Sequence, residues 1–276
     1  MELGFLQLAW IIGAAAVLGS VYSSVVERHW IDIRKVRILL KRLPRTFSGL
    51  RIALFSDVHL GFFYGPRHLS AAAGIISRQA PDVICLTGDF IESNSSLAVL
   101  EPVIPALSAL NAPFGKYAVL GNHDYRAGSG HVAQCLETGG FRVLKNEYTV
   151  LRKETDSLYL IGLDDVLRGS PDPEKATRGI PGNSCKILLV HEPDCAGLIK
   201  APVDLQLSGH SHGGQIRLPL IGAPYTTRLG KKHISGLYRA GKYTVYTNRG
   251  LGTTILPVRF LCRPEITIIT LTTPDT

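Results

Sequence analysis

The sequence predicts an α/β fold with parallel strands, preceded by an apolar N-terminal helix. Three successive segments repeat one order, in which an apolar run is followed by polar residues and then by a stretch with helical spacing. Such units are typical of parallel sheets, whose ligand sites lie at the carboxyl ends of the strands. Between residues 141 and 165 the apolar runs are shorter, which predicts an antiparallel section. The chain of 276 residues is long enough to bury a large core.

The first apolar run covers residues 3–26 and contains no Asp, Glu, Lys, Arg or His. A helix of this length, at about 1.5 Å per residue, exceeds the roughly 30 Å hydrocarbon core of a bilayer, so a single tilted span is feasible. A cleaved signal peptide is the alternative, because residues 14–16 are three alanines. Signal peptides begin with basic residues, and Met1 and Glu2 are not basic. We therefore expect an uncleaved membrane anchor over residues 1–26.

Basic residues gather directly after this run. Residues 27–45 contain seven Lys or Arg and two Asp or Glu, which gives +5 of the net charge of +8. The positive-inside rule then predicts that the following domain lies on the cytoplasmic side of the cell inner membrane. Such a cluster is attracted to anionic lipid headgroups and accounts for much of the basicity, so no nucleic-acid partner is expected. The alternation of apolar residues over 36–40 also favours a strand.

These patterns divide the chain into three parts. We expect a transmembrane anchor over residues 1–26, a basic juxtamembrane segment and linker over residues 27–49, and one large domain over residues 50–276.

Residues that commonly bind metals follow five predicted strands, in the segments 50–55, 82–86, 117–120, 186–190 and 203–207. These candidate ligands are Asp57, His59, Asp89, Asn122, His191, His210 and His212. Seven mixed oxygen and nitrogen ligands are too many for one tetrahedral zinc, so they predict two divalent ions, with Asp89 best suited to bridge them. His123 stays free to handle protons. Two such ions can clamp a phosphate and generate hydroxide near neutral pH, which indicates phosphoester hydrolysis.

The order of these motifs is also informative. Asp-x-His, Gly-Asp, Gly-Asn-His-Asp, a single His and Gly-His-x-His follow one another from Asp57 to His212. The set resembles the calcineurin-like metallophosphoesterase superfamily, and this resemblance implies a four-layer α/β-β/α sandwich after the N-terminal helix.

The resemblance further implies a role for each candidate residue. Asp57, His59 and His212 resemble the ligands of a first metal. Asn122, His191 and His210 resemble the ligands of a second metal, with Asp89 shared between both. His123 resembles the residue that contacts the scissile phosphate and assists the leaving group, and Asp124 resembles the partner that orients His123.

Four further segments, residues 162–165, 208–216, 249–252 and 263–265, resemble a bacterial membrane-anchored subgroup. That subgroup includes broad phosphodiesterases and membrane-bound UDP-2,3-diacylglucosamine pyrophosphatases. It implies a lipid-linked or nucleotide-linked phosphoester substrate. Many superfamily members have a second acid three residues after the bridging Asp, and Glu92 occupies this position here. Arg249 is expected either to bind a substrate phosphate or to be a solvated loop arginine.

Some alternatives stay open at this point. Manganese is the metal expected first, but iron, zinc and magnesium also accept mixed Asp, Asn and His ligands. A non-enzymatic scaffold with the same fold would show eroded ligands, and none is eroded in this sequence. A nuclease is less favoured, because the basic charge lies next to the membrane span rather than in an aromatic and basic binding motif.

Overall fold

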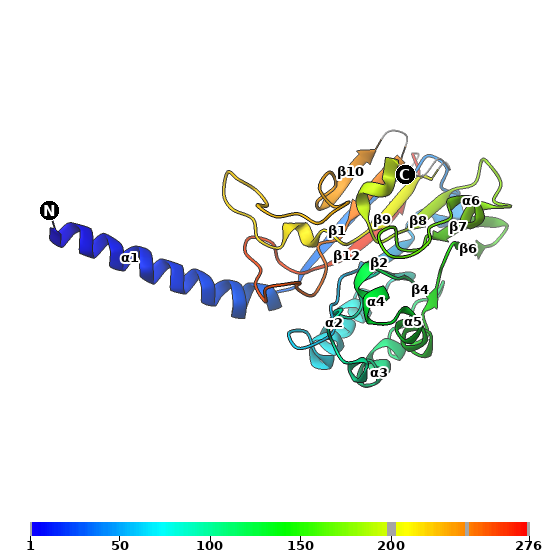
Figure 1. Ribbon diagram of the computed structural model, residues 1–276. Coiled ribbons are helices and arrows are strands. Elements are labelled where there is room, and N and C mark those ends of the chain that lie inside the picture. Colours follow the sequence, from blue (N-terminus) through cyan, green and yellow to red (C-terminus); the bar gives the residue numbers. More distant parts are fainter. Residues whose placement is uncertain (1, 198–202, 241–242, 275–276) are drawn as a thin grey trace.

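The computed structural model describes residues 2–197, 203–240 and 243–274 (Figure 1). Helix α1 (Glu2–Val21) projects away from the rest of the molecule, followed by the short turns Tyr22–Val26 and Glu27–His29. The stretch Trp10–His29 is long and apolar enough to cross a membrane. Many of its apolar side chains are exposed, because the rest of the domain does not cover this segment.

Two six-stranded sheets form the centre of the molecule. The first has the order β1-β12-β2-β3-β4-β5, and the second has the order β10-β11-β9-β8-β7-β6. The strands of the first sheet are β1 (Asp32–Leu39), β12 (Glu265–Thr272), β2 (Arg51–Phe55), β3 (Val83–Thr87), β4 (Lys116–Val119) and β5 (Arg142–Val143). Those of the second are β10 (Gly236–Ala240), β11 (Tyr243–Thr247), β9 (Leu205–Ser208), β8 (Lys186–Leu189), β7 (Asp156–Gly162) and β6 (Glu147–Lys153).

The strand directions agree with the sequence analysis. β2, β3 and β4 are parallel neighbours, and β8 and β9 are also parallel. β6 and β7 form an antiparallel pair, which is the antiparallel section expected after residue 141.

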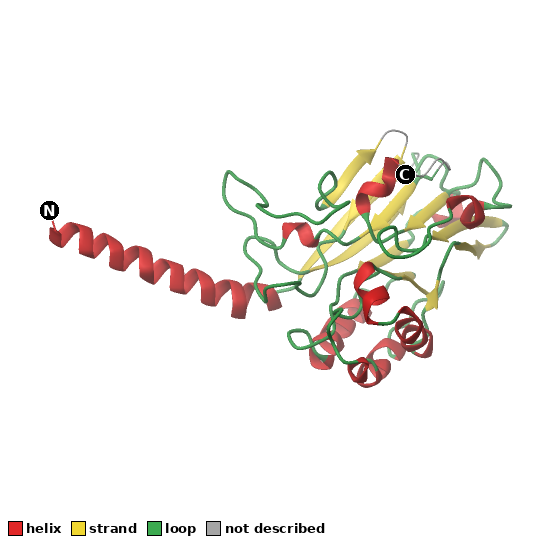
Figure 2. Ribbon diagram, in the orientation of Figure 1, coloured by secondary structure: helices red, strands yellow, loops and turns green. Residues whose placement is uncertain are grey.

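Helices cover the outer faces of both sheets (Figure 2). The first sheet is covered by α2 (Pro66–Arg78), α3 (Ile104–Ser108), α4 (Asn122–Ala127) and α5 (Ser129–Thr138), and α6 (Pro173–Thr177) lies on the second.

Side chains alternate between the faces of the strands and fill three buried clusters. In β2, Ala53 packs toward the helices, whereas Leu54 packs toward the second sheet. The third cluster joins the second sheet to Ala176 of α6. Three buried interfaces separate four layers, so the predicted four-layer sandwich is confirmed.

Two predicted segments differ in detail. The apolar spacing over residues 97–110 predicts one helix. The structure instead contains the 3-10 turns Leu97–Val99 and Glu101–Val103 before α3 begins. Pro102 and Pro105 lack a backbone N–H, which interrupts a continuous hydrogen-bond ladder. The Gly, Pro, Asp and Ser content of residues 168–184 predicts a loop. The structure places α6 there, and the Asp172 side chain caps its first turn by accepting from the Lys175 N–H at 2.9 Å.

The basic segment after α1 is built into the first sheet. β1 is an edge strand and pairs in parallel with β12 over its full length. Ile38 is buried, whereas Arg34, Lys35 and Arg37 are exposed. The segment expected as a juxtamembrane linker therefore contributes a strand that presents its positive charge to solvent.

Candidate metal centre

The candidate ligands from both sheets meet at one site. The loops after β2, β3 and β4 supply one half, and the loops after β8 and β9 supply the other. The side chains concerned are Asp57, His59, Asp89, Asn122, His191, His210 and His212, and all are buried. Ligand sites of parallel sheets lie at the carboxyl ends of the strands, and the fold brings these five strand ends together.

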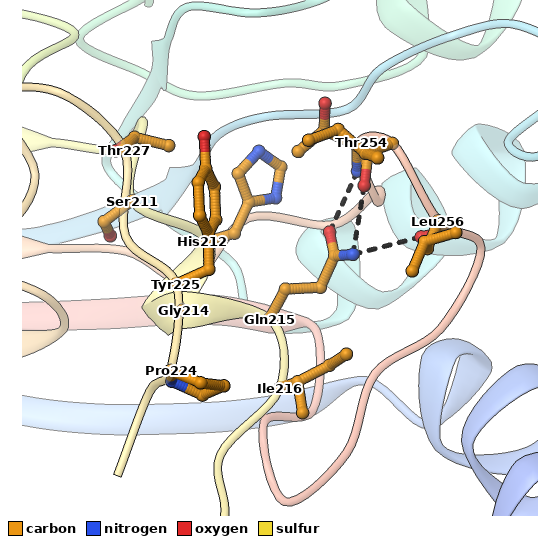
Figure 3. Close-up of a pocket in the computed structure, with 11 residues that line it drawn as sticks. Ser211, His212, Gly214, Gln215, Ile216, Pro224, Tyr225, Thr227, Thr254 and Leu256 are labelled. Carbon is orange, nitrogen blue, oxygen red and sulfur yellow. Dashed lines mark hydrogen bonds between the residues drawn. The ribbon is translucent and has the colours of Figure 1, made fainter.

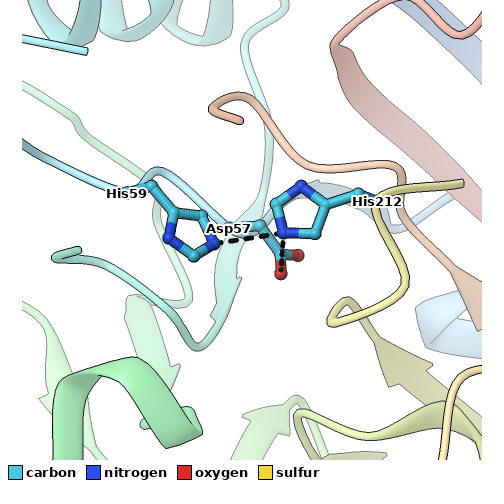
Figure 4. A group of neighbouring side chains, drawn as sticks. All are labelled: Asp57, His59 and His212. Atoms are coloured by element: carbon cyan, nitrogen blue, oxygen red, sulfur yellow. Dashed lines mark hydrogen bonds and ion pairs between the residues drawn. The ribbon is translucent and has the colours of Figure 1, made fainter. Parts of the chain in front are cut away.

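Asp57, His59 and His212 form the first cluster (Figure 4). One ligand atom from each lies within 4.8 Å of the others. The Nε2 atoms of His59 and His212 are 3.1 Å apart, and His212 Nε2 is 3.4 Å from Asp57 Oδ1. Three lone-pair donors therefore converge on one small volume.

Asp89, His191 and His210 form the second cluster with the same 4.8 Å limit. His191 Nε2 is 3.1 Å from Asp89 Oδ2 and 3.1 Å from His210 Nδ1. Asp89 Oδ2 also lies 3.7 Å from His59 Nε2 in the first cluster. A single carboxylate oxygen thus faces both clusters, which is the position a bridging ligand needs.

Backbone carbonyl groups hold the ring nitrogens of His191 and His210 that point away from the second cluster. His191 Nδ1 lies 2.7 Å from the Thr87 carbonyl oxygen, and His210 Nε2 lies 2.7 Å from the Arg228 carbonyl oxygen. A carbonyl accepts only, so each of these nitrogens carries a proton, and the opposite nitrogen of a neutral ring keeps its lone pair. Such contacts fix the ring and its tautomer for metal ligation. Burial would lower the pKa of His191, but the facing Asp89 carboxylate raises it well above its usual value, so a metal ion would have to displace a proton from His191 Nε2.

Buried polar atoms without hydrogen-bond partners test whether the site fits a metal ion. Asn122 Oδ1 and His212 Nδ1 are buried and have no hydrogen-bond partner among the described residues. Leaving a buried polar group without a partner costs about 1–3 kcal/mol. A divalent ion next to Asn122 would remove that cost, because an amide oxygen is an ordinary ligand for hard and borderline cations. The donor set therefore fits divalent metal ions.

Burial keeps His210 and His212 neutral. It lowers the pKa of His210 to about 3, and the neighbouring His191 adds to this effect. It likewise lowers the pKa of His212 well below its usual value, with a further contribution from His59. Both imidazoles are consequently neutral at physiological pH and can ligate. Burial alone would raise the pKa of Asp89, but His191 outweighs this effect and holds that pKa well below its ordinary value.

His123 lies at the border of the first cluster. Its Nδ1 atom is 2.8 Å from Glu92 Oε1 and 2.8 Å from Ser93 Oγ, while Glu92 Oε2 is 3.0 Å from His59 Nδ1. Burial would lower the pKa of His123, but the hydrogen bond to Glu92 and the charge of Asp89 raise it above its usual value. Glu92 therefore supports one candidate ligand and one candidate proton donor at the same time.

The backbone of the site is unusual. Five candidate ligands have positive φ angles, with Asp57 at 48°, His59 at 49°, Asp89 at 52°, His210 at 67° and His212 at 52°. Such angles are uncommon for residues other than glycine and cost on the order of 1–3 kcal/mol each. Strain of this kind concentrates at functional sites.

Two motif glycines explain why the loops can approach so closely. A Cβ atom on Gly121 would lie 2.3 Å from Asp89 Oδ1, and one on Gly209 would lie 1.9 Å from Ser56 Oγ. Any larger residue would push apart the loops that carry Asn122 and His210.

Comparison with known proteins agrees with this geometry. The family model described as calcineurin-like phosphoesterase matches residues 50–214, which include every candidate ligand. The chain belongs to the calcineurin-like phosphoesterase family. As a member of this family, the protein is a metal-dependent phosphoesterase, and the prediction of a hydrolase is confirmed.

Similar proteins cover almost the whole chain. The uncharacterized metallophosphoesterase YkuE of Bacillus subtilis (strain 168) is 42% identical over 91% of this chain and 88% of its own length. The phosphodiesterase YaeI of Escherichia coli (strain K12) is 31% identical over 91% of this chain and 92% of its own length. The UDP-2,3-diacylglucosamine pyrophosphatase LpxG of Chlamydia muridarum (strain MoPn / Nigg) is 28% identical over 94% of both chains.

The Asp124 carboxylate has other hydrogen-bond partners than the His123 ring, which the family resemblance implied as its partner. Its carboxylate accepts hydrogen bonds from the backbone N–H groups of Phe90, Ile91 and Gly121, at 2.8, 3.1 and 2.9 Å. These contacts tie the start of α4 to the loop after β3 rather than orienting His123. The carboxylate that contacts the His123 ring is that of Glu92. The sequence signal for this role of Glu92 was its position three residues after Asp89.

The contacts of Arg249 support neither of its two expected roles, a ligand of a substrate phosphate or a solvated loop arginine. Its guanidinium is bound to Glu265 Oε2 at 2.5 Å and to Asp32 Oδ2 at 2.6 Å. Its side chain is only 13% exposed, so it is not a solvated loop arginine. Since two carboxylates occupy its donors, we do not assign it a substrate phosphate. It joins the two neighbouring strands β1 and β12 to the loop after β11.

Proposed function

We propose that this phosphoesterase is a dinuclear-metal phosphodiesterase or pyrophosphatase that acts on a lipid-linked or nucleotide-linked substrate at the membrane. One observation carries the dinuclear part of the proposal. Asp89 Oδ2 faces His191 at 3.1 Å and His59 at 3.7 Å, so two ligand clusters share one oxygen. A single metal ion would need only one of the two clusters.

Each cluster is proposed to hold one ion. Asp57, His59 and His212 would bind the first ion. Asn122, His191 and His210 would bind the second, with Asp89 common to both. Bound divalent ions, of which manganese is the first expected and iron, zinc or magnesium the alternatives, would supply Lewis-acid stabilisation of the phosphoryl oxygens and lower the pKa of bound water.

His123 is proposed to give a proton to the leaving oxygen. Its Nδ1 faces the Glu92 carboxylate, so Nδ1 carries a proton and the ring nitrogen on the opposite side, Nε2, faces away from Glu92. The carboxylate also stabilises the protonated ring, which is the form that can donate. Ser93 and Glu92 together hold the ring in one orientation.

The membrane part of the proposal rests on the N-terminus. Trp10–His29 is long and apolar enough to span a bilayer, and the exposed basic residues of β1 follow directly. We infer that the span anchors the enzyme and that the basic residues lie against anionic headgroups on the cytoplasmic side of the inner membrane. An anchored enzyme gains most from a substrate that shares the bilayer. Because the chain is similar to the UDP-2,3-diacylglucosamine pyrophosphatase LpxG, the first specific candidate substrate is UDP-2,3-diacylglucosamine, in lipid A synthesis.

The generic activity is tested with bis(p-nitrophenyl) phosphate and added manganese. We expect hydrolysis by the full chain and a loss of at least about a hundredfold for Asp89→Asn and His123→Ala. Equal rates in all three proteins would contradict the proposed site. Metal analysis of the purified protein checks the dinuclear claim, since two ions per chain are expected and one ion per chain would overturn it.

The substrate and the orientation need separate tests. Membranes that contain the chain are incubated with UDP-2,3-diacylglucosamine, and UMP release is expected. No UMP, while a generic diester is cleaved, would leave only the phosphodiesterase part of the proposal. Proteolysis of the domain by external protease in intact cells would contradict the cytoplasmic orientation.

A further inference from the structure

An apolar cavity opens directly beside the first metal cluster. It has a volume of about 190 Å³ and is lined on one side by His212, a proposed ligand. Ile216, Tyr225 and Leu256 provide much of its apolar wall (Figure 3). Ile255 also lines the cavity. The cavity therefore shares the wall residue His212 with the first cluster.

The walls of this cavity are held together by one side chain. Gln215 donates from Nε2 to the carbonyl oxygens of Thr254 and Leu256, both at 3.0 Å, and its Oε1 accepts from the Thr254 N–H at 2.9 Å (Figure 3). These bonds join the loop after β9 to the loop after β11. They also satisfy the polar atoms of Gln215, so the cavity is preformed and offers few free polar groups to a ligand.

The same loop is bonded to the end of the N-terminal helix. The Arg259 N–H donates to the Ser23 carbonyl oxygen at 3.0 Å, and the Cys262 N–H donates to Glu27 Oε1 at 2.5 Å. Ser23 and Glu27 lie at the end of the candidate membrane span. The wall of the cavity is thus fixed next to the point where the chain would leave the bilayer.

Exposed apolar side chains surround that point. Phe62 is 95% exposed and Ile255 is 77% exposed, while Leu220 and Ile221 project fully or largely into solvent. The loops that contain them, in the ranges 61–65, 217–224 and 254–262, lie on the side of the molecule from which α1 projects (Figure 1). Apolar loop tips around the base of a membrane span are typical of contact with the bilayer interface.

A second cavity near the site has a basic lining instead of an apolar one. This larger open cavity of about 620 Å³ is lined by Arg228, Lys231 and Lys232, together with Asp194. It adjoins the second cluster, because the Arg228 carbonyl oxygen contacts His210 Nε2 at 2.7 Å. Alternate residues of one loop line the two cavities: Tyr225 and Thr227 line the apolar cavity beside His212, and Thr226 and Arg228 line the basic one.

We propose that the apolar cavity holds the part of a lipid acyl chain nearest to the phosphate, while the phosphate group lies at the metal clusters. This rests on the proposed phosphoesterase function and adds a binding site for the apolar part of the substrate. The polar remainder of the lipid extends toward Arg228 and Lys232. The distal chain stays in the bilayer between the exposed loop tips. Each methylene group that leaves water for the cavity strengthens binding about fourfold.

Two substrates with the same leaving group measure this effect. p-Nitrophenyl methyl phosphate and p-nitrophenyl octyl phosphate are hydrolysed by the full chain in detergent with manganese, each below its own aggregation concentration. We expect kcat/KM to be at least tenfold higher for the octyl diester. Leu256→Ser lowers this ratio about tenfold, because it replaces apolar wall by a hydroxyl group. Leu237→Ser, an exposed leucine of β10 outside the cavity, leaves the ratio as it is.

Photolabelling gives a readout that needs no turnover. Octyl phosphate with a photoreactive diazirine on its chain is bound to the full chain, and the labelled peptides are mapped. We expect labels within residues 211–227 and 254–256, reduced in Leu256→Ser and retained in Leu237→Ser. Labels outside these residues, or an equal octyl-to-methyl ratio in wild type and Leu256→Ser, overturn the inference. If neither diester is hydrolysed, the proposed function fails, and the labelling pattern still decides whether the cavity binds the chain.

Discussion

Nδ1 of His123 lies 2.8 Å from Oε1 of Glu92, and the other oxygen of the same carboxylate lies 3.0 Å from Nδ1 of His59. One glutamate therefore connects the proposed proton donor to a proposed ligand of the first metal. The pKa of Glu92 is held below its usual range: burial would raise it, but the hydrogen bonds to His123 and His59 outweigh burial. The carboxylate stays charged throughout the physiological range.

Glu92→Gln tests this connection. The amide keeps the size of the side chain but removes the charge that holds both rings. We expect kcat to fall about 10- to 100-fold, the range typical for residues that orient ligands. The pH dependence of kcat should also shift to lower pH on its alkaline side, because the protonated form of His123 loses its stabilising partner. Glu101→Gln, at an exposed glutamate remote from the site, is the matched control. A kcat equal to wild type would contradict the orienting role.

The neighbours Asn122 and His123 should separate metal binding from turnover. Asn122 presents a buried oxygen without a partner, whereas His123 is bound to Glu92 and Ser93. We expect Asn122→Ala to lower the metal content of the purified protein. His123→Ala should keep the metals and lower kcat about 10²- to 10⁴-fold. Equal metal loss in both variants, measured by elemental analysis, would refute the division of roles.

Arg249→Gln distinguishes a structural arginine from one that binds substrate. The change leaves the fully buried carboxylate of Glu265 without its cation. Removing one partner of a buried ion pair costs about 3–5 kcal/mol in the free energy of unfolding. The double variant with Glu265→Gln should recover part of this loss, because no charge then stays buried alone.

The exposed pair Arg142–Glu147 provides the control for Arg249. Its side chains are 50% and 45% exposed, so Arg142→Gln should change the free energy of unfolding by less than about 1 kcal/mol. Urea denaturation measures both changes. An unchanged stability for Arg249→Gln together with a raised KM would restore the substrate-binding interpretation.

Asp194 makes stability depend on acid pH. Burial would raise the pKa of Asp194, but the backbone N–H of Lys232 and the contacts with His233 outweigh it and lower that pKa. Stability from a carboxylate with a lowered pKa is present above its unfolded pKa of about 3.9 and is lost as pH falls through the folded value. Asp194→Asn should therefore cost about 1–2 kcal/mol at pH 7 and nothing below the folded pKa.

The measurement for Asp194 is the urea midpoint as a function of pH, with chelator present throughout. Glu137→Gln, at an exposed position of α5, should show no such pH-dependent difference. A constant difference between Asp194→Asn and wild type at all pH values would contradict the electrostatic explanation.

The parallel strands, and the convergence of the candidate ligands at their ends, were predictable because both depend on local order. Asp57 follows an apolar strand directly, and parallel strands deliver their ends to one edge. The partner of His123 was not predictable in the same way. Glu92 and Asp124 are both near in sequence, and only the path of the loop after β3 decides which carboxylate meets the ring.

The ion pairs of Arg249 were hidden for another reason. Its partner Asp32 is more than 200 residues away in the chain, in a strand whose place at the edge of the sheet follows from pairing with β12. The apolar cavity likewise combines two distant loops, and nothing in either loop alone indicates the other.

The five proposed ligand residues with positive φ angles imply a conflict between stability and catalysis. Glycine at Asp57, His59 or His212 would relax the backbone and remove a metal ligand in the same step. A screen that selects only for heat resistance in the presence of chelator should therefore enrich inactive proteins with glycine at these positions. With metal present, the screen should enrich the native residues instead, because metal ligation then offsets the cost of the strained backbone.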